Sequence, residues 1–374
     1  MSAGETDLGI VLGTRPEIIK LAPVINAAER RGAEYTVIHT GQHYSRTLDG
    51  VFFEQLELSP PAYNLDVGSD THAAQTGAMV AEIERALLGE TPETVVVHGD
   101  TNSALAGSVA ASKLDTTLSH VEAGLRSFDR TMPEEVNRVV ADHAADHLFA
   151  PTADSAATLR EEGIPDERIT VTGNTIVDAV TRHRDLAERK STVLAEFGVA
   201  PGDFFLLTAH RAENVDDRDR FERLLAGVAE CAATAEQPVI YPVHPRAAER
   251  IETFDLDVPA GIRLVEPQSF LDFLRLETAA RLVFTDSGGI QEEACILGTP
   301  CITLRDNTER PETVSVGANR VIGVEPDAIV AGARAAARAP RGWENPFGDG
   351  RAAERILDTV GIGTRRASAE EVTR

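Results

Sequence analysis

The chain has 374 residues, of which 42% are hydrophobic, and its 60 acidic residues outnumber its 36 basic residues to give a formal net charge of −24. This length exceeds what one hydrophobic core usually supports, so we expect two domains with a cleft between them. No apolar stretch reaches the roughly 20 residues of a membrane helix, and no basic stripe exists to neutralise phosphates, which argues against membrane and nucleic-acid partners.

The first half of the chain alternates short β-rich runs with amphipathic helical runs. Pro16 fits the start of the first helix, where a missing N–H costs no intrahelical bond. β-rich runs are predicted at 7–13, 35–41, 94–100, 117–124, 148–152 and 169–173, and helical runs at 16–32, 101–114 and 133–148. This order indicates an α/β domain built on a doubly wound parallel sheet.

The second half repeats the alternation and predicts a second Rossmann-like domain. β-rich runs are predicted at 204–210, 239–244, 262–267, 281–286 and 300–306, and helices at 220–235 and from Gly289. The charged stretch between the halves reads as a connecting helix and loop, which places the domains at 1–175 and 176–345. A further helix near 350–365 is expected to pack back on the first domain.

Composition also bears on the compartment and on the solvent. The N-terminal segment lacks the basic start and apolar core of a signal peptide, so we expect a cytoplasmic protein. Cys231, Cys295 and Cys301 lie in apolar contexts without paired metal-ligand spacing and are interpreted as core residues. Only three basic residues are lysines. Acidic, lysine-poor surfaces suit concentrated salt, which screens charge within about 3 Å at 1 M, and we infer a halophilic source.

The segment GTRPEIIK, residues 13–20, is the first candidate anion site. Residues just beyond the carboxyl ends of parallel strands face the ligand crevice. Gly13 would form the turn, Arg15 would lie at the mouth of the helix and Lys20 further along it. A turn with solvated basic residues is the alternative, but lysine is rare in this chain, so we expect contact with an anion.

The segment TDSGGIQEE, residues 285–293, predicts a diphosphate site where a strand turns into a helix. Free N–H groups and the helix dipole attract anions there, and Gly288 and Gly289 let a phosphate approach the backbone. Ser287 can cap the helix and also donate to phosphate. Glu293, deeper in the helix, could accept hydrogen bonds from two ribose hydroxyls. Ordinary first-turn acids are the alternative interpretation for Glu292 and Glu293.

Three carboxylates of the first half stand out by position, because each follows an apolar strand or opens the next helix at the expected ligand edge. They are Asp100, Glu122 and Glu134. Exposed acids are otherwise the default in so acidic a chain. Glu135, the neighbour of Glu134, is expected to be solvated or paired with Arg138.

The second half places His210 beside Arg211 and His244 beside Arg246, each pair after a strand. A histidine at a strand end can be a satisfied core residue, but two beside arginines favour a role with phosphate or in acid catalysis. No GxxxxGK[ST] loop is present and no GxGxxG follows the first strand, so the usual ATP and NAD signatures are missing. Tight metal-ligand spacing is missing too, and neither a metal nor a cofactor is implied.

A series of motifs extends from about residue 9 to 325. It comprises GTRPEIIKLAPVI, TGQHY, HGDTNSALAG, HVEAGLRSFDRTMPEEVNR, TGNTIVD, TAHRAENV, YPVHPR and TDSGGIQEEA followed by TERPE. In order and spacing the series resembles the non-hydrolysing UDP-N-acetylglucosamine 2-epimerases. One motif alone would not be specific, whereas the series is.

The resemblance implies the GT-B architecture, with a nucleotide sugar in the cleft and a homodimer as the expected assembly. The residues that match the family's UDP-sugar site are Arg15, His210, Ser287, Gly288 and Gly289 for the diphosphate, Glu293 for the ribose, the segment around Phe273 for the uracil, and also His244 and Arg310. Those that match its catalytic set are Asp100, Glu122, Glu134, His210 and Lys20.

The implied reaction is reversible conversion of UDP-N-acetylglucosamine to UDP-N-acetylmannosamine, by anti elimination of UDP to 2-acetamidoglucal and re-addition. Which acid plays which part is left open. The alternatives are a 2-epimerase of a UDP-2,3-diacetamido-hexuronic acid, a GT-B glycosyltransferase, a hydrolysing relative and a nucleotide-sugar sensor. Some members are activated by a second substrate molecule near the motif of Gln42 and His43, but the next segment lacks the arginine that they use.

Overall fold

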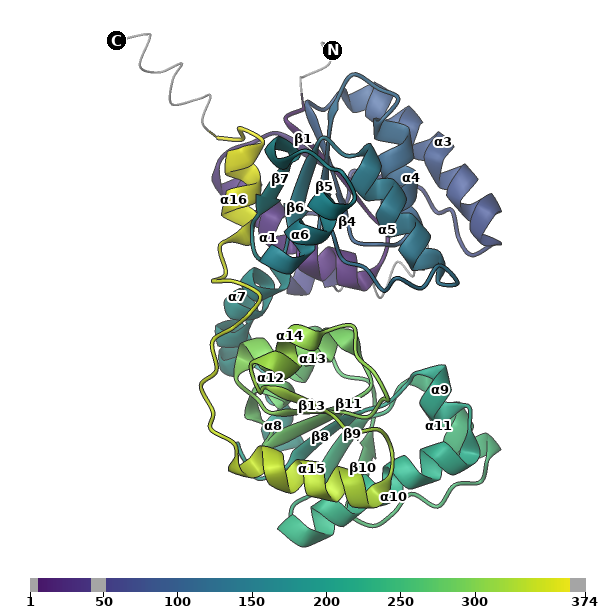
Figure 1. Ribbon diagram of the computed structural model, residues 1–374, viewed down its shortest axis with the longest axis vertical. Coiled ribbons are helices and arrows are strands. Elements are labelled where there is room, and N and C mark those ends of the chain that lie inside the picture. The colour runs from purple at the N-terminus through teal and green to yellow at the C-terminus, as the bar shows by residue number, and fades with distance from the viewer. Residues whose placement is uncertain (1–5, 42–51, 364–374) are drawn as a thin grey trace. The chain divides into compact units, whose positions relative to one another are not determined.

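The computed structural model describes residues 6–41 and 52–363, so Gln42 and His43 lie outside the described residues. The chain divides into two compact units. The first contains residues up to Ala179 together with those from Phe347 onward, and the second is Val180–Pro346. Each unit holds one parallel sheet with helices packed around it (Figure 1). The prediction of two doubly wound α/β domains is therefore confirmed.

The sheet of the first unit has the strand order β3-β2-β1-β4-β5-β6-β7 among the described residues, and all neighbouring strands are parallel. The strands are β1 (Leu8–Leu12), β2 (Tyr35–His39), β3 (Tyr63–Asn64), β4 (Thr94–His98), β5 (Thr117–Val121), β6 (His147–Ala150) and β7 (Ile169–Val171). The chain adds strands β1 to β3 toward one side of the sheet and strands β4 to β7 toward the other, so the strand order reverses between β1 and β4. Such a switch point is where open α/β sheets bind ligands, at the carboxyl ends of the strands.

The helices of the first unit fill the connections between its strands. They are α1 (Arg15–Arg30), α3 (His72–Glu90), α4 (Asn102–Ala111), α5 (Pro133–Ala144), α6 (Ala153–Glu161), the 3₁₀ turn η1 (Asp166–Arg168), the start of α7 (Thr175–Lys190) and α16 (Ala352–Thr359). α16 packs beside α1. Asp178 accepts hydrogen bonds from the first two N–H groups of α16, at 3.1 and 3.0 Å, which anchors the end of the chain to this unit.

The second unit repeats the topology with the order β10-β9-β8-β11-β12-β13, so its switch point lies between β8 and β11. Its strands are β8 (Phe205–Thr208), β9 (Val239–Pro242), β10 (Ile262–Val265), β11 (Leu282–Thr285), β12 (Cys301–Thr303) and β13 (Asn319–Val321). Its helices are α8 (Val193–Glu196), α9 (Ala212–Val215), α10 (Arg218–Ala235), α11 (Pro245–Thr253), α12 (Phe270–Ala279), α13 (Gly288–Leu297), α14 (Pro311–Ser315) and α15 (Pro326–Arg338).

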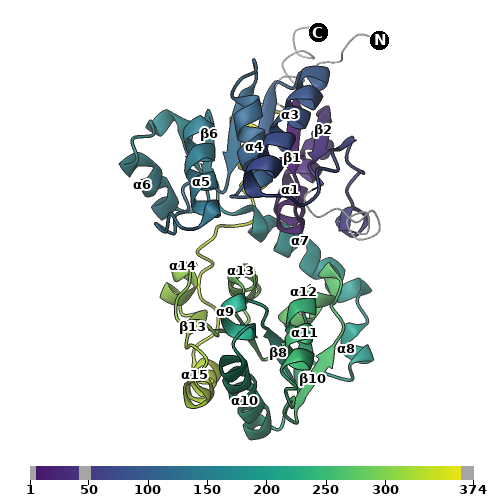
Figure 2. The same ribbon diagram turned by 90° about the vertical axis from the view of Figure 1, so that its right-hand side faces the viewer.

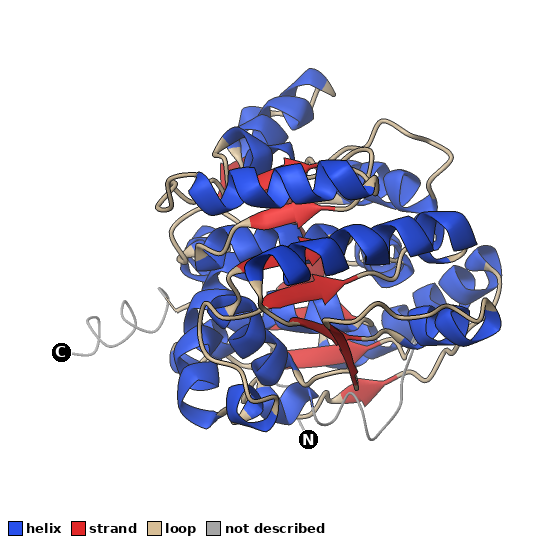
Figure 3. Cartoon of the chain, turned by 90° about the horizontal axis from the view of Figure 1, so that it is seen from below, coloured by secondary structure: helices blue, strands red, loops and turns tan. Residues whose placement is uncertain are grey.

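Successive side chains of β8 point to opposite faces of the second sheet, and each face carries its own hydrophobic core. Phe205 and Leu207 pack with α10 and α15 on one face, and Leu206 packs with α12 and α13 on the other. Figure 2 and Figure 3 show helices on both faces of the strands. Within the described ranges no helix combines the length and the apolar character needed to cross a bilayer.

Candidate active site

In each unit the residues singled out from the sequence gather at the switch point. In the first, Arg15 follows β1, Asp100 follows β4 and Glu122 follows the adjacent β5. In the second, His210 follows β8 and Ser287 follows β11. Because the carboxyl ends of parallel strands share one edge of a sheet, each unit presents its own set of candidate residues there.

Glu122 is the centre of a buried cluster in the first unit. Its side chain is 6% exposed, and Lys20, 12% exposed, donates to both carboxylate oxygens at 2.7 and 2.9 Å. Asn174 donates to Oε1 at 3.2 Å, and His98 Nε2 lies 3.0 Å from Oε2. The carboxylate therefore has a fixed position and a buried cation beside it, as preorganised electrostatics requires.

The backbone at Glu122 has a left-handed conformation, with φ of 69°, which is uncommon for a residue other than glycine. Its N–H and that of Ala123 both donate to Phe149 O at 3.1 Å. His120, two residues earlier, bonds Asp142 at 2.6 Å through Nδ1 and the carbonyl of Gly99 at 2.8 Å through Nε2. Burial opposes protonation of His120, but Asp142 outweighs it and raises the pKa of that imidazole. The charged pair joins β5 to α5, and the bond to the Gly99 carbonyl ties the end of β5 to the end of β4.

Asp100 and Glu134 differ in how firmly they are held. Arg138 donates to Asp100 Oδ2 at 3.0 Å through Nε and at 2.6 Å through Nη2. Glu134 is solvent-exposed in the first turn of α5. Its neighbour Glu135 is buried and pairs with Arg138 at 2.8 Å, as the sequence predicts. Burial acts to raise the pKa of Glu135, but hydrogen bonds from Ser127 and Arg138 outweigh it and lower that pKa.

Buried Glu17 positions the turn that carries Arg15. It accepts the N–H groups of Gly13 and Thr14, at 3.0 and 2.8 Å, which forms a capping box for α1. It also accepts the hydroxyl of Thr101 at 2.7 Å, so the turns after β1 and β4 are joined. Arg15 itself is exposed, with its guanidinium carbon 5.1 Å from the centre of the Phe52 ring.

In the second unit, the N-terminus of α13 has the properties of a phosphate site. Ser287 is the N-cap residue, but contrary to expectation its hydroxyl makes no capping hydrogen bond. A Cβ added at Gly288 or Gly289 would meet no atom closer than 3.9 Å, and neither residue has a positive φ. Packing therefore does not require these glycines, and their missing side chains leave the first N–H groups open to an anion.

His210 is oriented by Asp286, which is fully buried. The N–H groups of His210 and Arg211 donate to Asp286 Oδ2 at 2.9 and 3.0 Å, and His210 Nδ1 lies 3.3 Å from Oδ1. Burial acts to raise the pKa of Asp286, but the bond to His210 outweighs it and lowers that pKa. The imidazole of His244 lies beside that of His210, with ring centroids 5.3 Å apart, and burial together with His210 lowers its pKa.

The acids of α13 have separate partners. Glu292 is buried, and its Oε1 lies 2.7 Å from Nε of Arg310. It therefore holds the predicted substrate-binding arginine and is more than an ordinary first-turn acid. The carboxyl group of Glu293 faces that of Glu277 of α12. Phe273 of α12 packs in the same cluster as Ile290 of α13, so the segment predicted for the uracil lies next to the predicted phosphate terminus.

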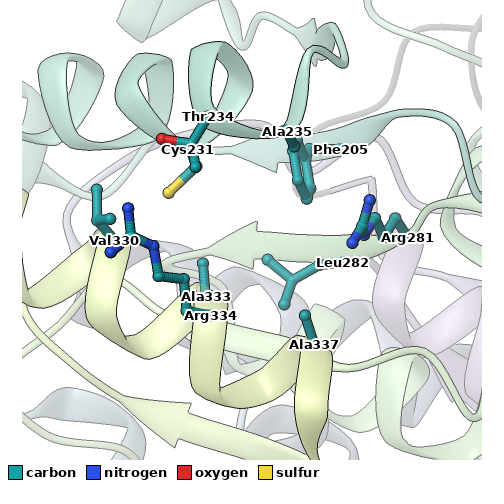
Figure 4. Close-up of a pocket in the computed structure, with 10 residues that line it drawn as sticks. All are labelled: Phe205, Cys231, Thr234, Ala235, Arg281, Leu282, Val330, Ala333, Arg334 and Ala337. Atoms are coloured by element: carbon teal, nitrogen blue, oxygen red, sulfur yellow. The ribbon is translucent and has the colours of Figure 1, made fainter.

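A cavity of about 150 Å³ lies elsewhere in the second unit. Figure 4 shows it between α10 and α15, with Phe205 and Leu282 at its base. Those two residues begin β8 and β11, so the cavity is at the amino ends of the strands, opposite the switch point. It holds none of the predicted site residues.

Several residues of the two sets were not singled out from the sequence, among them His98, Asn174, Asp286 and Glu277. His98 ends β4 and Asn174 follows β7 by three residues, both within quoted motifs at strand ends, the signal that identified Asp100. Glu277 follows Phe270 and Leu274 at helical spacing on the buried face of α12, so an acid at a core position was its signal. No group of three or more His, Cys, Asp or Glu that could hold a metal ion occurs in the described part of the chain.

The comparisons with known proteins agree with one another. A family model described as UDP-N-acetylglucosamine 2-epimerase matches residues 26–361. A UDP-N-acetylglucosamine 2-epimerase of Methanocaldococcus jannaschii is 50% identical over 362 residues, or 95% of this chain and 99% of the relative. A crystal structure of the M. jannaschii UDP-GlcNAc 2-epimerase in complex with UDP-GlcNAc and UDP matches with a TM-score of 0.85 at 50% identity, again over 95% and 99%. A UDP-2,3-diacetamido-2,3-dideoxy-D-glucuronate 2-epimerase of Pseudomonas aeruginosa is 39% identical over 353 residues, or 93% and 97%.

Proposed function

Because this chain belongs to the UDP-N-acetylglucosamine 2-epimerase family, we propose that it is a non-hydrolysing isomerase that interconverts UDP-N-acetylglucosamine and UDP-N-acetylmannosamine. The observation that carries the proposal is the contrast between the two switch points. The switch point of the second unit has a helix terminus with two glycines that packing does not require. The switch point of the first unit has the lysine-paired carboxylate of Glu122, with Asp100 and Glu134 nearby in the chain. The second unit would bind UDP and the first would act on the sugar.

The chemistry must loosen a C2–H bond that has no carbonyl group beside it. In the proposed route the C1–O bond breaks and its electron pair leaves with UDP, while a base takes the proton from C2 and the C–H pair forms the C1=C2 double bond of 2-acetamidoglucal. Re-addition of UDP at C1, with protonation of C2 on the opposite face, gives the epimer. No redox partner is needed, because re-addition of UDP restores the C1–O bond and C2 gains one proton for the one that it lost.

Each requirement of this route matches a group at the switch points. Cationic character at C1 is stabilised by a fixed carboxylate, the role we assign to Glu122. Proton transfer at C2 needs carboxyl groups that reach the substrate on both faces, the role we assign to Asp100 and Glu134. Lys20 positions Glu122 through its two hydrogen bonds.

The leaving diphosphate requires donors and positive charge. We assign this to the N-terminus of α13 with Ser287, Gly288 and Gly289, and to the side chains Arg15, His210, His244 and Arg310. Asp286 supports this role, because a bond to Nδ1 of His210 leaves Nε2 for a phosphate oxygen. Glu293 would accept from the ribose hydroxyls, and Phe273 would lie against the uracil.

Proton NMR of UDP-N-acetylglucosamine with the purified protein, in concentrated KCl made up in D2O, tests the function. We expect UDP-N-acetylmannosamine to form and deuterium to enter C2. Conversion without deuterium at C2 would exclude the elimination route, and free N-acetylmannosamine would indicate a hydrolysing enzyme. Binding without conversion would leave a sensor, or an enzyme for a UDP-2,3-diacetamido-hexuronic acid, which the same assay with that sugar would decide.

We also propose a homodimer that works in concentrated salt in the cytoplasm. The formal net charge of −24 and the scarcity of lysine support the salt requirement. Sedimentation velocity across a KCl series measures the assembly, and a monomer at every salt concentration would contradict it.

A further inference from the structure

A second carboxyl group lies behind the predicted ribose ligand. Glu277 of α12 is 0% exposed, and its carboxyl faces Glu293 of α13, which packs against α12. Neither Glu277 oxygen receives a hydrogen bond from an N–H or O–H donor among the described residues. An ionised carboxylate without a donor or a counter-ion is very costly in such a place.

The surroundings of Glu277 favour its neutral form. Among the described residues, the electrostatic neighbours of its carboxyl group are Glu293 and, on β12, the buried Cys301 thiol, and neither brings a positive charge. Burial, reinforced by the Glu293 carboxylate, raises the pKa of Glu277 well above its usual range. Two carboxyl groups in contact cannot both ionise cheaply, so they share one proton.

We propose that Glu277 is a positioning residue: it stays protonated, donates a hydrogen bond to Glu293, and holds that carboxylate for a vicinal diol. The proposal rests on the ribose contact assigned above to Glu293. The pair would carry a single negative charge on the more exposed partner. The ionised carboxylate of Glu293 can then accept hydrogen bonds but not donate them. The site therefore favours a ligand that offers two hydroxyl groups and disfavours a phosphate, which is an anion.

Helix geometry gives this anchored carboxylate a defined distance from the phosphate terminus. Glu293 follows Gly289 by four residues, so both lie on one face of α13 and are separated by about 6 Å along its axis. A diphosphate and the ribose attached to it can therefore contact one helix face. Without the hydrogen bond from Glu277, the Glu293 side chain would be less well positioned before the ligand arrives, which weakens binding.

The test compares Glu277→Leu and Glu277→Gln with the unaltered protein, with UDP and 2′-deoxy-UDP as probes in calorimetry. The unaltered protein should prefer UDP by roughly tenfold or more, the value of a hydrogen bond to a charged group. Glu277→Leu should lose most of this preference, because it removes the hydrogen-bond donor that positions Glu293. Glu277→Gln should keep most of it, since the amide N–H replaces the carboxylic O–H as donor.

A matched control separates positioning from general damage to α12. Leu276→Val alters another fully buried side chain of the same helix, and it should lower the unfolding temperature while leaving the preference for UDP intact. A Glu277→Leu protein that binds both probes more weakly by the same factor would overturn the proposal, as would a Glu277→Gln protein that behaves like Glu277→Leu.

The outcome also distinguishes this inference from the proposed function. If the unaltered protein converts the nucleotide sugar and discriminates between the probes, but Glu277→Leu discriminates equally well, the epimerase assignment stands and the positioning role fails. If the unaltered protein binds neither probe, the proposed function itself fails.

Discussion

Replacement of the two glycines at the start of α13 by alanine separates the needs of the fold from those of the ligand. At Gly288 the nearest atom to an added Cβ is Glu309 Oε2, and at Gly289 it is Ser287 Oγ, each at 3.9 Å. This is ordinary van der Waals contact, and the backbone of neither residue is left-handed. Gly288→Ala and Gly289→Ala should therefore fold without strain.

The expected magnitudes have opposite signs for stability and for binding. Alanine in place of a helical glycine stabilises by up to about 0.5–1 kcal/mol, which raises the unfolding temperature of a unit of this size by about 2–4 °C. The methyl group, however, occupies the space through which a phosphate would reach the N–H groups. Losing one charge-assisted hydrogen bond weakens UDP binding by roughly 10- to 150-fold.

The assay is paired: thermal unfolding without ligand and calorimetry with UDP, both in concentrated KCl. Gly77→Ala is the matched control, because Gly77 lies inside α3 with nothing within 4 Å of its added Cβ. It should show the same gain in stability and unchanged UDP affinity. Unchanged affinity in the double variant Gly288→Ala/Gly289→Ala would refute the assignment of this terminus to the diphosphate, and a large loss of stability would show that the fold needs the glycines.

Further predictions concern charge. Glu122→Gln should retain UDP affinity and lose about 10²- to 10³-fold in turnover by NMR, the cost of removing one preorganised electrostatic group, and a weakly affected rate would reassign the residue. Glu134→Gln should slow turnover without loss of stability, whereas Glu135→Gln should lower the unfolding temperature, because it removes the charge of a buried partner of Arg138. Asp286 has a lowered pKa in the folded protein, so its carboxylate stabilises fully above its unfolded pKa near 3.8 and progressively less as pH falls through the folded value. Asp286→Asn should therefore be less stable at pH 7, with a difference that vanishes in strong acid, measured by denaturant unfolding across pH. Added KCl should raise the unfolding temperature, because it screens the net charge of −24, and an unfolding temperature independent of salt would contradict this.

The fold was predictable because the sequence pattern and the topology carry the same information. Buried parallel strands read as short apolar runs, and the helices between them keep a 3.6-residue period. Arg15, Asp100, Glu122, His210 and Ser287 each lie at or just beyond the carboxyl end of a predicted β-rich run, so their gathering at the carboxyl edge of the sheet in their own unit follows from chain order.

Partners that come from distant parts of the chain were not predictable in the same way. Asn174 reaches Glu122 across 52 residues, and Glu354 of α16 reaches Arg31 across 323. Periodicity gives the face of a helix but not which polar group stands opposite it. Glu277 illustrates the limit: its spacing from Phe270 and Leu274 indicates burial, yet only the packing of α12 on α13 shows that it meets another acid.

At both switch points the residues that matter are ones that the fold alone does not explain. Glu122 has a backbone conformation that costs about 1–2 kcal/mol for a residue with a side chain. Its carboxylate is paired with the nearly buried Lys20, and removing one partner of such a pair costs about 3–5 kcal/mol. Gly288 and Gly289 are the converse case, since alanine would fit and stabilise the helix there. The strain at Glu122 and the missing methyl groups at Gly288 and Gly289 are therefore features that the proposed roles in catalysis and in phosphate binding would explain, and that the packing of each unit does not.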